Sequence, residues 1–229
     1  MRTLHFRSFA VAAAALLATA GALVAEERPN GLLNSLEVRE LVGRAEPADN
    51  ARLAVHFSTL ADQYAAEAKR HRSMSQSFVA NPTRNLGTGM SVHCKQLADL
   101  NTRSATAVRE LAAYHEKLAA GAPATLPRDG ARFQGGAGAP EPTKKELNAL
   151  AAKAGTPADH EAIEEYFLTL ARRYMLAADE HIALAQAYRG TRIAQAAVIQ
   201  DRLASLARDS AKEAAAAADM HKQLANIAR

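Results

Sequence analysis

Apolar side chains recur in four long stretches of the chain at spacings of three, four and seven residues, which is the period of one helical face. The stretches cover residues 53–78, 97–118, 163–188 and 203–224. Each carries one apolar row, and charged residues occupy the other faces. A helix with a single apolar row cannot enclose a core by itself, so the pattern predicts helices that pack against one another.

The same helical unit occurs twice in the chain. At a shift of 110 residues Pro47-Ala48-Asp49 falls on Pro157-Ala158-Asp159, and the matches continue in register along the stretch that follows. They include Phe57 with Phe167, Tyr64 with Tyr174, His71 with His181, and Phe78 with Tyr188. The next loop is four residues shorter in the second unit, so beyond it the shift is 106 and His115 meets His221. Matches over so long a stretch predict an internal duplication.

Capping signals place a short helix at the start of each unit. Asn34 with Glu37, and Thr143 with Glu146, have the capping-box spacing, in which each residue's side chain bonds the other's backbone. These signals predict short helices over residues 35–44 and 144–154. A Pro-Ala-Asp sequence then begins each long helix, because proline suits the first turn and a carboxylate suits the positive end of the helix dipole.

Each unit continues from its short helix into two long helices, over residues 48–78 and 90–120 in the first copy and 158–188 and 192–228 in the second. Two such hairpins packed face to face bury all four apolar rows. We therefore predict an all-α, four-helix-bundle-like fold of two duplicated hairpins, each preceded by a short helix. The alternative is an open pair of hairpins that dimerises to cover its apolar rows.

A segment dense in glycine and proline, residues 121–142, separates the two units. It predicts a linker between a first repeat at residues 26–120 and a second repeat at residues 143–229. We expect the two repeats to pack as one bundle.

The N-terminus has the pattern of a cleaved signal peptide, which we assign to residues 1–25. Arg2 and Arg7 form a basic start, an uncharged Ala/Leu-rich stretch follows, and small residues suit cleavage after Ala22 or Ala25. The alternative is an uncleaved anchor, for which the apolar stretch is at the short limit. The alanine and arginine usage is typical of bacteria. We expect a periplasmic or secreted protein with no stable membrane insertion after cleavage.

Charge argues against a nucleic-acid partner. Without residues 1–25 the chain has 26 basic and 24 acidic residues, and it has no basic block with interleaved aromatic residues. Its alanine-rich apolar rows also lack the bulky anchors of helices that act on membrane surfaces. A mixed, well-solvated surface is consistent with a protein that binds another protein or associates with itself.

Known catalytic and cofactor patterns are absent from the sequence. It contains no Cys-x-x-Cys pair for redox chemistry or zinc and no Cys-x-x-Cys-His for c-type haem. No Glu-x-x-His pair for a di-iron centre lies on the long helices, and no phosphate-binding glycine motif precedes one. We expect no catalytic residues, and the first functional hypothesis is a non-enzymatic binding or scaffolding role.

The histidines, the single cysteine and nearby methionines support a second hypothesis, the binding of copper or zinc. His71 lies near the end of its helix and His93 and Cys94 begin the next, so a hairpin places them at a similar height with Met74. If the second hairpin packs in the same sense, His181 joins this group of imidazole, thiol and thioether ligands. The opposite end would then gather His56, His115 and His221.

Each of these residues also has a structural interpretation. A histidine in an apolar row can be a core residue hydrogen-bonded to a tyrosine or a carbonyl, and such polar layers set the register of bundles. Cys94 can be a buried inert thiol, form an intermolecular disulfide or ligate a metal. Adjacent residues diverge by about 100° on a helix, so His93 and Cys94 do not readily point the same way. Gln200 stands at the Cys94 position in the second copy.

Overall fold

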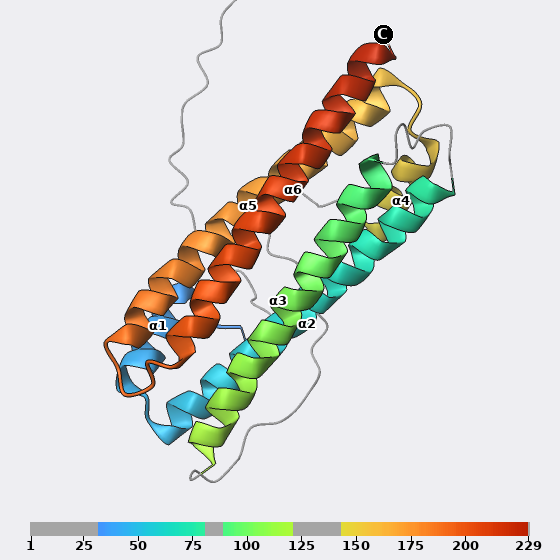
Figure 1. Cartoon of the computed structure of the whole chain (residues 1–229). Helices are drawn as coiled ribbons and strands as arrows, with labels where there is room; N and C mark the ends of the chain where they lie inside the picture. Colours follow the sequence, from blue (N-terminus) through green and yellow to red (C-terminus); the bar gives the residue numbers. More distant parts are fainter. Residues whose placement is uncertain (1–31, 81–88, 121–142, 229) are drawn as a thin grey trace, which may run out of the picture.

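The computed structural model describes residues 32–80, 89–120 and 143–228. The predicted signal peptide, residues 1–25, and the predicted linker, residues 121–142, lie outside the described residues. The described chain is all-helical, which confirms the predicted fold class (Figure 1). Its elements are α1 (Ser35–Arg44), α2 (Pro47–Val79), α3 (Gly89–Ala119), α4 (Lys144–Lys153), α5 (Pro157–Arg189) and α6 (Ala196–Ile227). Each copy therefore has the predicted order of one short helix and two long ones.

Capping side chains begin the helices where the sequence predicts them. Asn34 exchanges side-chain and backbone hydrogen bonds with Glu37 at the start of α1, and the equivalent pair does so at the start of α4. Thr156 and Asp159 form a further capping box at the start of α5. Glu46, at the equivalent position before α2, makes no capping hydrogen bond with its side chain. The backbone N–H groups at the start of α2 therefore lack the side-chain acceptor that those at the start of α5 have.

The helix α6 begins one turn later than the sequence predicts. The Thr191 hydroxyl accepts the backbone N–H of Ile193 at 3.2 Å, and the N–H groups of Ala196 and Ala197 bond carbonyls three residues back. The segment after α5 is thus a series of tight turns. Ile193 is buried within these turns. In the sequence a buried isoleucine in a turn looks the same as a core position of a helix, so the predicted helix began too early.

The two hairpins pack in opposite senses (Figure 1). Helices α2 and α6 run in one direction along the bundle, and α3 and α5 run in the other. One apolar cluster therefore joins Phe57, near the start of α2, to Tyr188, at the end of α5. The second cluster joins Phe78, at the end of α2, to Phe167, near the start of α5. Each end of the bundle thus combines the loop end of one hairpin with the open end of the other.

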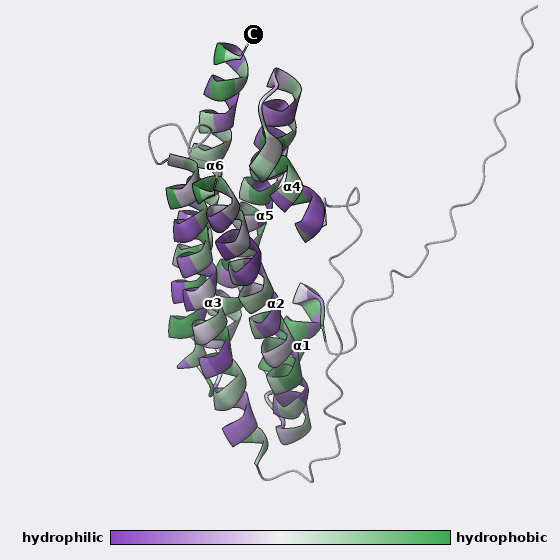
Figure 2. Cartoon of the chain, turned by 90° about the vertical axis from the view of Figure 1, so that its right-hand side faces the viewer, coloured by the Kyte–Doolittle hydropathy of each residue, from purple (hydrophilic) through white to green (hydrophobic). Residues whose placement is uncertain are grey.

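The two hairpins lie close together on one side of the bundle, at α3 and α6, and farther apart on the other, at α2 and α5, which we call the wide side. Buried alanines such as Ala105 and Ala211 allow α3 and α6 to approach closely. No Cα atoms of α2 and α5 come within 8 Å of each other, and these helices touch through long side chains such as Tyr64 and His181. The short helices α1 and α4 contact both α2 and α5 and cover opposite ends of this wide side (Figure 2).

Polar and apolar residues are interspersed along the long helices (Figure 2). Among the described residues, none of the helices combines the length and the hydrophobicity that crossing a membrane would require.

Candidate functional site

Polar side chains are built into the interior of the bundle, and histidine is the most frequent of them in the described part of the chain. The buried histidines are His56, His71, His115, His160, His181 and His221. Burial disfavours the charged imidazolium, and a neutral ring offers one donor and one acceptor nitrogen. The partners of these nitrogens decide which histidines are structural and which are available to a ligand.

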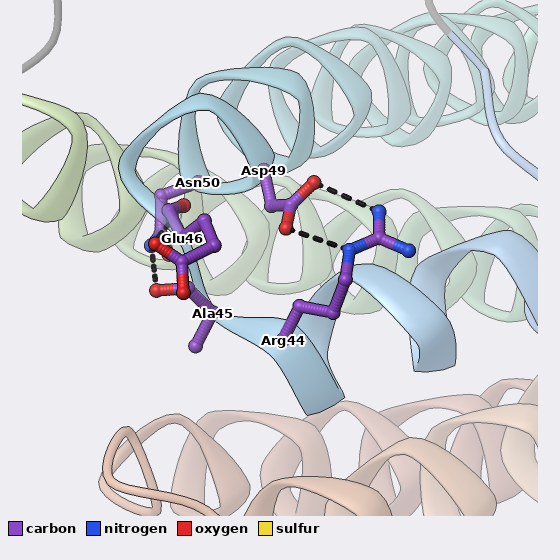
Figure 3. A network of polar contacts seen from close by, with 5 residues as sticks. All are labelled: Arg44, Ala45, Glu46, Asp49 and Asn50. Atoms are coloured by element: carbon purple, nitrogen blue, oxygen red, sulfur yellow. Dashed lines mark hydrogen bonds and ion pairs between the residues drawn. The ribbon is translucent and has the colours of Figure 1, made fainter.

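The junction between α1 and α2 positions the side chain of Asn50 (Figure 3). Ala45 ends α1 in the left-handed conformation, with φ 51°, and turns the chain toward α2. Arg44 donates hydrogen bonds of 2.9 and 3.0 Å to the Asp49 carboxylate and lowers its pKa. The Asn50 amide nitrogen donates to the carbonyl oxygens of Ala45 and Glu46, at 3.1 and 2.9 Å. The Asn50 carbonyl oxygen is thereby left to face the interior.

His115 on α3 is satisfied at both ring nitrogens. Its Nδ1 lies 2.7 Å from Asn50 Oδ1 and donates to it, because the Asn50 amide nitrogen is already used. Its Nε2 accepts from the Tyr188 hydroxyl at 2.8 Å, and Phe57 stacks on the ring with centroids 5.5 Å apart. Burial, with the nearby His56, lowers the pKa of His115 to about 4. We interpret His115 as a structural residue that joins α2, α3 and α5.

The equivalent site in the second copy lacks one of these partners. His221 takes the place of His115, His160 that of Asn50, and Phe78 that of Tyr188. The Nδ1 atoms of His160 and His221 lie 3.1 Å apart, so one ring donates to the other. The Nε2 of His221 has no partner among the described residues, since Phe78 carries no hydroxyl group. Burial is the main reason that the pKa of His221 falls to about 3.

His181 on α5 is also satisfied at both ring nitrogens. Its Nδ1 donates to Gln200 Oε1 on α6 at 2.7 Å. Its Nε2 accepts from the Tyr64 hydroxyl on α2 at 3.2 Å, so this bond crosses from one hairpin to the other. Burial lowers the pKa of His181. This layer matches the structural interpretation, in which a buried histidine bonds a tyrosine and fixes the register of the bundle.

His71 is the counterpart of His181 and has neither of these bonds. Its side chain is 0% exposed, and neither ring nitrogen has a hydrogen-bond partner among the described residues. Cys94 stands where Gln200 bonds the ring in the other copy. A thiol is a weak hydrogen-bonding group, so this exchange removes the strong acceptor that an imidazole N–H needs.

The tyrosine layer beside His71 is arranged differently as well. Tyr174, the counterpart of Tyr64, accepts a hydrogen bond of 2.7 Å from the Asn101 amide. Burial, followed by the charges of Arg70 and Arg173, lowers the pKa of His71 to about 3. The ring is therefore neutral at physiological pH and keeps a lone pair for a ligand.

Cys94 and Met74 lie in one buried apolar cluster, and Met74 follows His71 by three residues, close to one turn of α2. The Ser75 hydroxyl donates to the Ser91 carbonyl at 2.9 Å, which sets the register between α2 and α3. One turn further from the loop, this register puts Cys94 opposite His71. Cys94 is a free thiol with 0% of its surface exposed, and Met74 is 1% exposed.

His93 and His56 have partners of their own. His93 pairs through Nδ1 with Glu213 on α6. His56 accepts the backbone N–H of Leu33 at its Nδ1 at 3.1 Å and packs edge-to-face on Phe57, with ring centroids 4.8 Å apart. Burial is the main cause that lowers the pKa of His56 to about 4.

The structure brings together part of the first predicted metal group. Met74 and Cys94 share one buried cluster, and the repeat places His71 and Cys94 at the positions of His181 and Gln200. His93 turns toward α6, and His181 lies about two turns of helix from His71. Within the described ranges, no three side chains of the His, Cys, Asp and Glu types are placed to hold a metal ion. A metal at this level would therefore need methionine sulfur among its ligands.

The second predicted group is divided between the two ends of the bundle. His56 and His115 lie at the same end, on either side of Phe57. His221 lies at the other end, beside Phe78 and Phe167. The predicted group assumed that the two hairpins pack in the same sense. Because they pack in opposite senses, His221 lies at the other end of the bundle from His56 and His115.

The partner of His221 was missed from the sequence. His160 aligns with Asn50 at the shift of 110, and each lies seven residues before the buried phenylalanine of its helix. That spacing places it on the buried face. The repeat alignment therefore contained a signal for a polar pair at this level, although not for the direct contact between two imidazoles.

The outer surface carries a shallow groove between α5 and α6. Its apolar lining consists of Leu168, Ala171, Met175, Leu176, Ala211 and Ala215. Leu176 is 66% exposed and Met175 is 46% exposed, and with the other lining residues they form one contiguous apolar patch. Charged residues from both helices surround this lining.

Comparison of the chain with protein-family models, with curated proteins and with solved structures yields no match.

Proposed function

We propose that this protein is an exported, non-enzymatic binding protein whose second hairpin binds an amphipathic helix of a protein partner in the groove between α5 and α6. The observation that supports this proposal is that the groove carries large exposed apolar side chains in only one of two copies that share a fold. A feature required for folding would be expected in both copies.

The first hairpin is polar or small at the equivalent positions. Leu168, Met175, Leu176 and Ala215 of the groove correspond to Ser58, Ala65, Ala66 and Arg109. The hairpin of α2 and α3 forms with these residues, so the fold does not need the larger apolar side chains. Each large apolar side chain that a partner covers contributes about 1.5–3 kcal/mol when fully buried. Leu176 and Met175 are thus candidates for the central contacts of an interface.

The shape and the charges of the groove suit a helix. Two helices packed side by side, with small residues between them, accept the apolar face of a third helix. Arg208 and Lys212 flank the groove on α6, and Arg172 and Asp179 flank it on α5. We expect the partner helix to present acidic residues toward α6 and a basic residue toward Asp179, because such pairs steer association.

The test exchanges the groove residues for those of the other copy. In the source cells, chemical crosslinking of the wild type is compared with the double variant Met175→Ala, Leu176→Ala, which introduces the residues of the first hairpin. We expect the variant to keep its helical content and melting temperature and to lose one defined crosslinked species. Val198→Ala, at a 69% exposed position outside the groove, is the matched control and should keep that species. An unchanged crosslinking pattern in the double variant would refute the proposal.

Export is tested separately by sequencing the N-terminus of the protein from fractionated cells. The signal-peptide prediction expects a chain that begins at Leu23 or Glu26 in the exported fraction. A chain that keeps residues 1–25 and stays with the cell membrane would support the uncleaved anchor instead.

A further inference from the structure

The two copies treat one buried histidine in different ways. His181 has Gln200 and Tyr64 on its two ring nitrogens, at 2.7 and 3.2 Å. His71 has no hydrogen-bond partner for either nitrogen in the described chain, although it is fully buried. A buried polar group left without a partner costs about 1–3 kcal/mol. The first copy thus keeps an imidazole in a place where the second copy had to supply two hydrogen bonds.

Three sulfur-containing residues of the first copy stand at positions where the second copy has none. Cys94 stands in place of Gln200, and Met74 stands in place of Leu184. Met90, one turn before Cys94 on α3, stands in place of Ala196 and is 1% exposed. These three residues belong to one buried cluster. Since His181 bonds Gln200 in the second copy, the repeat places the unpartnered His71 ring opposite the position of the Cys94 thiol.

We propose that His71, Cys94 and Met74 bind one cuprous ion inside the first hairpin. Thiolate and thioether sulfur are soft ligands that select Cu(I), and imidazole nitrogen is compatible with it. On binding, the Cys94 thiol releases its proton to solvent and the sulfur–copper bond forms, with no change in oxidation state. Met90 lies in the same cluster and is positioned to supply a fourth ligand.

Charge selects a monovalent ion at this site. One thiolate and one Cu(I) sum to zero, and the imidazole and the thioether are neutral, so the complex suits an apolar interior. A divalent ion would leave one uncompensated positive charge in the core, which is strongly unfavourable. The positive charges of Arg70 and Arg173 also act on His71, and they disfavour a further positive charge at this site.

The test is an anaerobic titration with Cu(I) in competition with a chromophoric cuprous chelator. The full chain is used in two ways, by long incubation of the folded protein and by refolding from urea with Cu(I), so that burial of the site does not prevent loading. We expect one tightly bound ion per chain. X-ray absorption of the loaded protein should show both sulfur and nitrogen ligands.

The second copy supplies substitutions that the fold already accepts. Cys94→Gln should weaken Cu(I) binding by about 100-fold or more, since even residues outside the coordination shell can change metal affinity 10–100-fold. Met74→Leu should weaken it by about tenfold. Met175→Leu, at an exposed methionine on α5, should leave it unchanged. Without metal, Cys94→Gln should also raise the melting temperature, because its amide oxygen gives His71 the partner that Gln200 gives His181.

Two results would overturn the proposal. One is the absence of competitive Cu(I) binding by the wild type after refolding. The other is equal affinity in the wild type and in the folded Cys94→Gln and Met74→Leu variants, which would place the ion elsewhere on the chain. Either result leaves the groove of the second hairpin untouched, because the two sites are in different hairpins.

Discussion

At the scale of single residues, the two copies differ by individual atoms at equivalent buried positions. His115 has the Tyr188 hydroxyl on its Nε2, whereas His221 faces the bare ring of Phe78. The ring centroids of His115 and Tyr188 lie 5.8 Å apart at an interplanar angle of 41°, and those of His221 and Phe78 lie 5.9 Å apart at 43°. A hydroxyl group on Phe78 would therefore be placed for His221 much as that of Tyr188 is placed for His115.

We expect Phe78→Tyr to stabilise the protein. The new hydroxyl donates to His221 Nε2, and a buried hydrogen bond contributes about 0.5–1.5 kcal/mol to the free energy of unfolding. Tyr188→Phe is the converse variant and should lower this free energy by about 1–3 kcal/mol, because it leaves His115 Nε2 without a partner. Urea unfolding of both variants measures the difference. A destabilised Phe78→Tyr protein would show that the two ends are not equivalent in this way.

At this scale the sequence predicts burial better than it predicts partners. The spacing of His71 and His181 within apolar rows placed them correctly on the buried faces. It could not indicate that Tyr64 bonds His181 whereas Tyr174 bonds Asn101, because periodicity reports the face of a helix and not the residue opposite. Exchanges such as Cys94 for Gln200 carried the stronger signal, since they mark where the copies diverge.

At the scale of helices, the copies differ at the starts of α2 and α5. Thr156 bonds the Asp159 amide and completes a capping box, whereas Glu46 leaves the first amides of α2 without a side-chain cap. The first four N–H groups of a helix have no partner within it, so this difference affects stability. Both helix starts were predicted, because capping depends on residues within one turn of each other.

We expect Glu46→Thr to raise the free energy of unfolding by about 0.5–1 kcal/mol. The threonine hydroxyl would accept the Asp49 amide N–H as Thr156 accepts that of Asp159. Thr156→Ala should lower the free energy of unfolding by about 1 kcal/mol. Thermal and urea unfolding of the two variants provide the check. An unchanged free energy of unfolding in Glu46→Thr would mean that the Arg44–Asp49 ion pair already stabilises the start of α2.

At the scale of the whole molecule, the two hairpins could pack in either sense. An apolar row is equally well buried by a parallel or an antiparallel neighbour, so the sequence did not distinguish the two. The opposite packing explains why Tyr188 meets His115 and why His221 lies far from His56. The bundle architecture was predicted because it depends on how many apolar rows there are, and the grouping of side chains was not, because it depends on direction.

The buried histidines should make the whole bundle sensitive to acid. Burial lowers the pKa of His56 and His115 to about 4 and that of His71 and His221 to about 3, against about 6.5 in an unfolded chain. Below pH 6.5 the unfolded state therefore binds more protons, and stability falls as the pH falls. Each such histidine contributes about 1.4 kcal/mol per pH unit in this range.

We expect the urea midpoint to be constant above about pH 7.5 and to fall steeply from about pH 6.5 to about pH 5.5, since this window lies above the range in which most carboxylates titrate. Unfolding followed by circular dichroism at half-unit pH steps measures this profile. A flat profile across the window would contradict the neutral, buried state of these rings.

We propose that the two copies build one scaffold and differ at the groove where a partner protein binds. Photo-crosslinking from equivalent positions tests this proposal, with a photoreactive residue at position 66 on α2 or at position 176 on α5. We expect a defined adduct with a partner protein from position 176, absent from position 66 and lost when Met175→Ala is added. Equal adducts from both positions, or none from position 176, would contradict it.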